Sequence, residues 1–320
     1  MLRVRVVAVV AVLLTATGCA VPPVRVTMPS GAGRPTALTI RVQVREGNAR
    51  VVREVPLEDY VAITALSEVH PETNDDGVAE RMFEVQAVMA RTYAVSNRGR
   101  HAKDGFDLCS TTHCQLYEPA RLRTSRWASV VRGAVAKTAG ELIWFAGAPA
   151  RAVFHADCGG HTSDAAAVWG GLAPAYLSGH RDSGPAGAAH TEWTFETRTA
   201  ALRAALNADP RTAVGARLDR IEVAGRDGAG RAEKILLRGS RTFVVRGEIF
   251  REVLTRALGV KTVRSTLFSV RKTRDMFVFS GKGFGHGVGL CQAGALARLK
   301  AGASPDEVLA HYFPGTTLRR

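Results

Sequence analysis

The chain has 320 residues, 46% of them hydrophobic, and a formal net charge of +14 that comes mainly from arginine. This length and apolar content exclude an intrinsically disordered protein and suffice for one large domain or two small ones. The basic charge suits nucleic acid, anionic lipid or an anionic wall polymer as a partner, or simply forms a solvated surface.

The N-terminus has the pattern of an export signal. Arg3 and Arg5 precede the apolar run 6–14, and small residues follow up to Cys19. Gly18-Cys19 is typical of a lipobox, in which Cys19 is lipidated after cleavage. The alternative is a simple signal peptide cut near Ala20. The sequence therefore predicts either a membrane-anchored lipoprotein or a protein secreted to the periplasm or cell wall, with no nucleic acid partner.

The remaining chain divides into a tether and a folded body. Residues 20–36 are rich in Pro, Gly and small residues and predict a flexible tether. Beyond it, no stretch reaches the length of apolar residues that a membrane span needs. The domain is expected over 37–320, with a smaller inserted subdomain at about 196–265.

Strands and helices do not alternate strictly along this domain. We therefore expect an α+β fold with mixed, largely antiparallel sheets rather than a doubly wound parallel sheet. The apolar periodicity predicts strands at 38–44, 49–55, 141–145, 152–155, 220–223, 234–237, 266–270 and 276–280. It predicts helices at 56–66, 80–97, 200–206, 248–258, 293–300 and 305–312.

Residues 281–294 carry a glycine at every second position from Gly281 to Gly289. Glycine costs backbone entropy and packs nothing, so the alternation indicates a bend or a close approach by a ligand or another chain segment. If the run is extended, Lys282 and His286 share one face and bare backbone forms the other. Both a glycine-rich corner and the floor of a ligand groove fit this pattern.

Several familiar catalytic signatures are absent from the sequence. It contains no G-x-S-x-G nucleophile elbow, no H-E-x-x-H zinc helix and no phosphate-binding P-loop. Covalent serine catalysis and zincin chemistry are therefore poorly supported.

An ordered set of short motifs resembles the SpoIID/LytB family, which includes the stage II sporulation protein D and the amidase enhancer LytB. The resemblance covers roughly residues 38–318. The motifs, in chain order, are LEDYV (57–61), SEV (67–69), EVQAVMARTYA (84–94), THCQLY (112–117), FHADCGGHT (154–162), VWG (168–170), GKGFGHGVGLCQ (281–292) and HYFPGT (311–316).

The resemblance implies a single SpoIID-like catalytic body that acts on peptidoglycan glycan strands as a lytic transglycosylase. It places the catalytic residue at Glu68. One carboxyl group suffices, because it can protonate the glycosidic oxygen and then draw a proton from the C6 hydroxyl of muramic acid, closing a 1,6-anhydro ring. No cofactor is required. The acid must be protonated near neutral pH, so an apolar site should raise its pKa.

Cys109, His113 and Cys114 form a Cys-x-x-x-His-Cys motif. Such closely spaced thiolate and imidazole ligands suit zinc, and some relatives in the family carry a structural zinc in this loop. His101 is then the candidate fourth ligand. A Cys109–Cys114 disulfide is the alternative, and it would be natural in an exported protein.

The other family motifs supply candidate contacts to the glycan. Cys158 and Cys291 lie in two of them and could form a disulfide or remain buried thiols. Arg91 and Lys282 could bind the lactyl carboxylate of muramic acid. The remaining candidate substrate-binding residues are Gln86, Tyr93, His155, His161 and His286.

Two further functions are compatible with this sequence. A non-catalytic wall-binding enhancer of a partner amidase is implied by the LytB side of the family, and a zinc-dependent wall hydrolase is the other. Release of anhydromuropeptides from purified sacculi would favour the transglycosylase over both.

Overall fold

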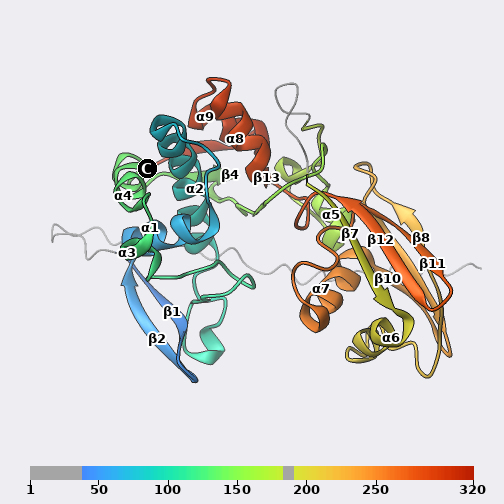
Figure 1. The fold of residues 1–320 in the computed structure, drawn as a ribbon. Helices are drawn as coiled ribbons and strands as arrows, with labels where there is room; N and C mark the ends of the chain where they lie inside the picture. The colour runs from blue at the N-terminus through green and yellow to red at the C-terminus, as the bar shows by residue number, and fades with distance from the viewer. Residues whose placement is uncertain (1–37, 183–190) are drawn as a thin grey trace, which may run out of the picture. The chain divides into compact units, whose positions relative to one another are not determined.

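The computed structural model describes residues 38–182 and 191–320. The predicted export signal, Cys19 and the tether lie outside these residues. The expected α+β class is confirmed, because helices combine with several mostly antiparallel sheets (Figure 1). Within the described ranges, no helix has the length and apolar character to cross a membrane.

The described residues bury two hydrophobic cores. The first collects side chains from Ile40 to Leu177 and from Val288 to Phe313, and the second from Trp193 to Phe279. The second core therefore extends beyond the expected bounds of 196–265 at both ends. The strands at the two ends of the second core, Glu192–Arg198 and Met276–Lys282, pair with each other, so the chain enters and leaves the second core at neighbouring positions.

A β-hairpin and two long helices begin the first core (Figure 1). Strands β1 (Thr39–Glu46) and β2 (Ala49–Pro56) pair antiparallel, and the short β3 (Leu108–Cys109) joins β1 in parallel. Helix α1 (Leu57–Glu68) follows directly, and α2 (Asp76–Ser96) packs on it, starting where the Asp75 side chain accepts a hydrogen bond from Val78 N–H.

Further short elements complete this core. Strand β4 pairs with both β5 and the C-terminal β14, and β6 pairs in parallel with β13. Helix α9 starts with a capping box between Ser304 and Glu307. The elements are α3 (Arg121–Thr124), α4 (Ala128–Lys137), β4 (Leu142–Phe145), β5 (Ala148–Pro149), β6 (Phe154–His155), α5 (Ala165–Trp169), β13 (Leu290–Cys291), α8 (Gln292–Lys300), α9 (Pro305–Tyr312) and β14 (Thr317–Arg319).

The second core lies among two antiparallel three-stranded sheets and two helices. The sheet orders are β10-β9-β8 and β11-β12-β7. The elements are β7 (Glu192–Arg198), α6 (Thr199–Asn207), β8 (Leu218–Arg226), β9 (Ala232–Gly239), β10 (Thr242–Arg246), α7 (Gly247–Leu258), β11 (Phe268–Thr273) and β12 (Met276–Lys282). Sequence patterning missed β7, β10 and α4.

The glycine run is not an extended strand. Strand β12 ends at Lys282, and Gly283, Gly285, Gly287 and Gly289 all have positive φ. A Cβ at any of these four glycines, or at Gly281, would meet another part of the same chain. The hypothesis of an open groove floor is therefore wrong, and the glycines allow close packing of the run against the neighbouring segments.

Gly283→Ala should lower the free energy of unfolding by at least about 1–2 kcal/mol, because alanine pays this much in the left-handed region. The new Cβ would also lie 2.7 Å from the carbonyl oxygen of Asp157, an overlap that adds to the loss. Gly147→Ala is the matched control, since Gly147 has φ +83° and open space around it. Urea unfolding of both variants checks this, and equal losses would contradict the packing role.

Candidate active site

Glu68 is the last residue of α1, a helix that is buried along most of its length. Residues 60–67 are all buried, so the helix lies inside the core, and Glu68 at its end is partly exposed. The chain turns extended at Val69, which is also buried. Glu68 therefore lies at the edge of the core, with its carboxyl group largely removed from water.

Two backbone groups of the following loop hold this helix end. The N–H of Leu116 donates to Oε1 of Glu68 at 2.5 Å, and the N–H of Glu118 donates to Oγ of Ser67 at 3.0 Å. Within the described residues, no group donates a hydrogen bond to Oε2. Oε1 is therefore fixed as an acceptor, and Oε2 is the oxygen that can carry and release a proton.

Burial raises the pKa of Glu68 to about 7, and the hydrogen bond from Leu116 opposes this only in part. The charge of Glu118 also raises the pKa of Glu68, but Glu118 is half exposed and pairs with Arg121 at 2.5 Å. Glu68 is therefore protonated for a large fraction of the time near neutral pH. This is the protonation state that a general acid needs.

Gln86 and Gln292 lie beside the same helix end. Nε2 of Gln292, the first residue of α8, is 3.3 Å from the carbonyl oxygen of Glu68 and 3.3 Å from Oε1 of Gln86. The structure thus brings Gln86 to the Glu68 end of α1 from α2, but its side chain is fully buried, which contradicts its predicted contact with the glycan. Sequence reasoning did not single out Gln292, although it ends the glycine-rich motif and a polar residue there was the available signal.

Tyr93 lies on the side of α2 that faces the Cys/His loop. Burial raises its pKa to about 12, and both Cys114 and Cys109 contribute to the shift. Its hydroxyl accepts a hydrogen bond from Arg100 at 3.4 Å. The neighbouring Tyr60 donates to Oε1 of Gln115 at 3.0 Å, so polar tyrosine contacts anchor the loop that carries Leu116.

The four residues predicted as zinc ligands come together. One donor atom from each of His101, Cys109, His113 and Cys114 lies within 4.8 Å of the others. His101 Nε2 is 3.4 Å from Cys114 Sγ, while its Nδ1 is 3.6 Å from the carboxylate of Asp104. A carboxylate behind a ligand histidine is the usual outer support of a zinc site, so the donor set fits zinc. Cys109 and Cys114 are free thiols, and the alternative disulfide is not formed.

The interpretation of Arg91 as a substrate contact is wrong. Its side chain is fully buried and donates to Glu58 at 2.6 and 2.9 Å and to the carbonyl of Glu141 at 3.3 Å. These partners occupy the guanidinium, which therefore joins α2 to α1 and leaves no surface for a glycan carboxylate. Glu58, in the first turn of α1, is one of its anchors.

His155 and His286 belong to a separate cluster with Trp169. The His286 ring centroid lies 5.5 Å from that of His155 and 5.1 Å from that of Trp169. Burial lowers the pKa of His286 to about 4 and that of His155 well below its usual value, so both rings are neutral. His155 is only 4% exposed, and this contradicts its predicted contact with sugar hydroxyls.

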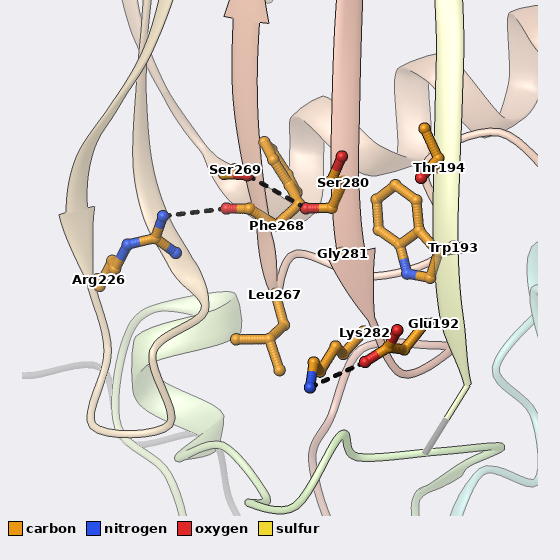
Figure 2. A pocket seen from close by; sticks show the side chains of 10 residues that line it. All are labelled: Glu192, Trp193, Thr194, Arg226, Leu267, Phe268, Ser269, Ser280, Gly281 and Lys282. Carbon is orange, nitrogen blue, oxygen red and sulfur yellow. Dashed lines mark hydrogen bonds and ion pairs between the residues drawn. The ribbon is translucent and has the colours of Figure 1, made fainter. Parts of the chain in front are cut away.

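Lys282 and His161 also lie apart from Glu68. Lys282 lines a cavity of about 570 Å³ among β7, β11 and β12, where it pairs with Glu192 at 3.0 Å (Figure 2). Figure 2 also shows Arg226 reaching the Phe268 carbonyl across the cavity, at 3.0 Å. His161 Nδ1 is 2.7 Å from the carbonyl oxygen of Thr162. Neither residue contacts the Glu68 neighbourhood through a described interaction.

Cys158 and Cys291 are free thiols in this structure, so the predicted disulfide is not formed. Both are fully buried, and the N–H of Cys158 donates to Sγ of Cys291 at 3.2 Å. The pairing of β6 with β13 brings the two family motifs together.

Comparison with known proteins agrees with this arrangement. Residues 45–145, which contain Glu68 and the Cys/His loop, match the family model for the stage II sporulation protein SpoIID. Residues 172–289, which contain most of the second core, match a model for a domain of unknown function, DUF8618. The fold and site therefore define a protein that carries a SpoIID domain.

Similarity to curated proteins extends over most of the chain. It is 29% identical to an uncharacterized protein of Brachyspira hyodysenteriae over 84% of this chain and 68% of that protein. It is 25% identical to the stage II sporulation protein D of Bacillus subtilis over 91% of this chain and 83% of that protein. The Bacillus subtilis amidase enhancer is 26% identical over 74% of this chain but only 37% of its own length. The SpoIID domain and these similarities to a stage II sporulation protein D and an amidase enhancer support a place for the chain in the SpoIID/LytB family and a function related to the bacterial cell wall.

Proposed function

We propose that the chain is a peptidoglycan lytic transglycosylase in which Glu68 acts first as general acid and then as general base. The observation that carries the proposal is the buried Glu68 carboxyl group, whose pKa is raised to about 7 while one oxygen is held by Leu116. A carboxyl group in this state can give up a proton and take one back near neutral pH.

The reaction needs one carboxyl group and no water. Oε2 of Glu68 donates its proton to the glycosidic oxygen as the bond from that oxygen to C1 of muramic acid breaks. The carboxylate then takes the proton of the C6 hydroxyl, and O6 bonds to C1 to close the 1,6-anhydro ring. Glu118, the acid that acts on Glu68 electrostatically, is bound to Arg121, which is consistent with a mechanism without a second catalytic carboxylate.

Gln292, which is partly exposed, is proposed to bind the glycan beside Glu68, while the buried Gln86 orients its amide. Gln292 holds both the Glu68 carbonyl and Gln86, so it orients the end of α1 as well as offering an amide to sugar hydroxyls. The export signal and the lipid anchor at Cys19 remain predictions from the sequence.

Mass spectrometry of the products from denuded and intact glycan strands tests the proposal. Fragments ending in 1,6-anhydromuramic acid are expected, whereas fragments with water added would indicate a hydrolase. If the protein released no fragments but accelerated a cell-wall amidase, the enhancer function suggested by the name of the Bacillus subtilis relative would replace it.

We also propose that His101, Cys109, His113 and Cys114 hold a structural zinc ion. Bound zinc would join the ends of a loop that also presents the Leu116 N–H to Glu68. No catalytic step requires the metal.

A Cys109→Ser/Cys114→Ser protein should bind about one zinc ion fewer per chain and melt several degrees lower, because metal binding at such sites contributes folding free energy. Elemental analysis and calorimetry measure the two effects. Unchanged zinc content would contradict the site. A chelator that abolished turnover without lowering the melting temperature would instead favour the zinc-dependent hydrolase.

A further inference from the structure

A second cluster of potential metal ligands lies where β6 pairs with β13. His155, Cys158 and Cys291 each place one donor atom within 4.8 Å of the others. The side chains are buried, with exposed fractions of 4% for His155 and 0% for both cysteines. One nitrogen and two sulfurs thus meet in the interior, where an unsatisfied polar group is costly.

The His155 ring is oriented as metal-bound histidines usually are. Its Nδ1 lies 3.1 Å from the carbonyl oxygen of Val288, and a carbonyl can only accept, so Nδ1 carries the proton. Nε2 therefore presents a bare lone pair. Among the described residues this buried nitrogen has no hydrogen-bond partner. A backbone carbonyl that fixes one ring nitrogen and leaves the other free is the outer support found behind histidine ligands.

Backbone N–H groups point at both sulfurs. Cys291 Sγ accepts from Cys158 N–H at 3.2 Å and from Gly294 N–H at 3.4 Å. Cys158 Sγ accepts from Gly160 N–H at 3.2 Å. Cys291 is also the N-cap of the nine-residue helix α8, whose dipole favours negative charge there. These donors would favour two thiolates once a cation is bound; without one, the neighbouring Cys158 side chain and burial raise the pKa of Cys291, and the Cys158 thiol donates to Asp182.

The geometry points to a buried binding site for a thiophilic metal ion, Zn²⁺ or Cu⁺, formed by His155 Nε2, Cys158 Sγ and Cys291 Sγ. Both ions favour thiolate and imidazole donors. On binding, the two thiols release their protons, and the imidazole binds as the neutral base. Asp182 Oδ2, 3.5 Å from Cys158 Sγ, lies just outside the three donors and already accepts from Tyr312 at 2.7 Å.

A metal ion at this site would link residues 155–158 to Cys291, two segments that are distant in sequence. Cys291 directly precedes Gln292, whose side chain reaches Glu68 and Gln86. A metal ion at this position would therefore fix the start of α8 beside the proposed catalytic acid. Binding of the metal is independent of whether the protein cleaves glycan strands.

Metal content of the full-length protein, purified anaerobically without chelators, tests the inference. The Cys109→Ser/Cys114→Ser background removes the loop site, and we expect about one zinc or copper ion per chain to remain there by elemental analysis. Adding Cys158→Ser/Cys291→Ser should remove it. His155→Ala should lower the occupancy, whereas the control His161→Ala should not.

A second measurement does not depend on the folding of the Cys158→Ser/Cys291→Ser variant. In the Cys109→Ser/Cys114→Ser background, alkylation followed by mass spectrometry should find Cys158 and Cys291 protected before chelation and modified after it. If this background carries neither metal, or if its intact mass is two hydrogens lower because a Cys158–Cys291 disulfide has formed, the metal site is overturned. Either result would leave the transglycosylase proposal standing.

Discussion

Glu68→Gln protein should lose cleavage of glycan strands by about 10²–10⁴-fold, because glutamine keeps the shape of the side chain but cannot transfer a proton. In the wild type, turnover should fall as the pH rises above about 7, since Glu68 must be protonated to act as an acid and burial raises its pKa to about 7. Release of anhydromuropeptides from denuded glycan strands, measured from pH 5 to 9, gives both results.

Glu72→Gln is the matched control for this experiment. Glu72 lies four residues further along the chain with an exposed side chain, so its turnover should match that of the wild type. If Glu68→Gln protein still released anhydromuropeptides at the wild-type rate, Glu68 would not be the catalytic acid.

The Glu68→Gln substitution should also stabilise the folded protein at alkaline pH. The folded-state pKa of Glu68 is about 7 against an ordinary value of 4.5, so the folded state favours the protonated form. This group imposes no penalty on stability below pH 4.5, and the penalty grows until the pH exceeds 7. At about 1.4 kcal/mol for each pKa unit, Glu68→Gln should raise the free energy of unfolding by about 3 kcal/mol above pH 7.

Urea unfolding at pH 4 and pH 8 separates this effect from a change in packing. We expect the two proteins to differ little at pH 4 and clearly at pH 8. A difference that did not change with pH would mean that the carboxyl group is not desolvated in the folded state.

Asp182→Ala should lower the free energy of unfolding by about 3–5 kcal/mol, because it removes one partner of a buried ion pair. The Asp182 side chain is fully buried and accepts from Arg298 at 3.0 Å and from Tyr312 at 2.7 Å. Burial alone would raise its pKa, but the His311 ring 3.7 Å away and the hydrogen bonds from Tyr312 and Arg298 outweigh burial and hold the pKa well below its usual value. Its contribution to stability is therefore present above the ordinary aspartate pKa and is lost on acidification.

Denaturant unfolding at pH 7 measures this loss, with Asp219→Ala as the control. Asp219 is 54% exposed and faces Arg217 at 3.9 Å, so its removal should change stability by less than about 1 kcal/mol. Similar losses in the two variants would show that the Asp182 cluster contributes little.

Particular elements show where sequence reasoning succeeded. The apolar periodicity predicted α2 and α9, because it is a local feature of the sequence, although α2 begins at Asp76, four residues before its predicted start. Strand β7 was missed because it pairs with β12, which is distant in sequence, and β10 was missed although it forms a hairpin with the preceding β9. The β-branched and aromatic residues within them were the available signal.

For the candidate site too, some features follow from the sequence and others from the tertiary structure. The sequence by itself determined the α+β class, the resemblance to the SpoIID/LytB family and the spacing of the Cys/His loop, because these depend on the order of residues along the chain. Only the tertiary structure decided that Arg91 is a buried structural group, that the glycines pack against their own chain, and that Gln292 joins Gln86 beside Glu68. Burial and contacts between distant segments fix these roles, and neither property can be read from local spacing.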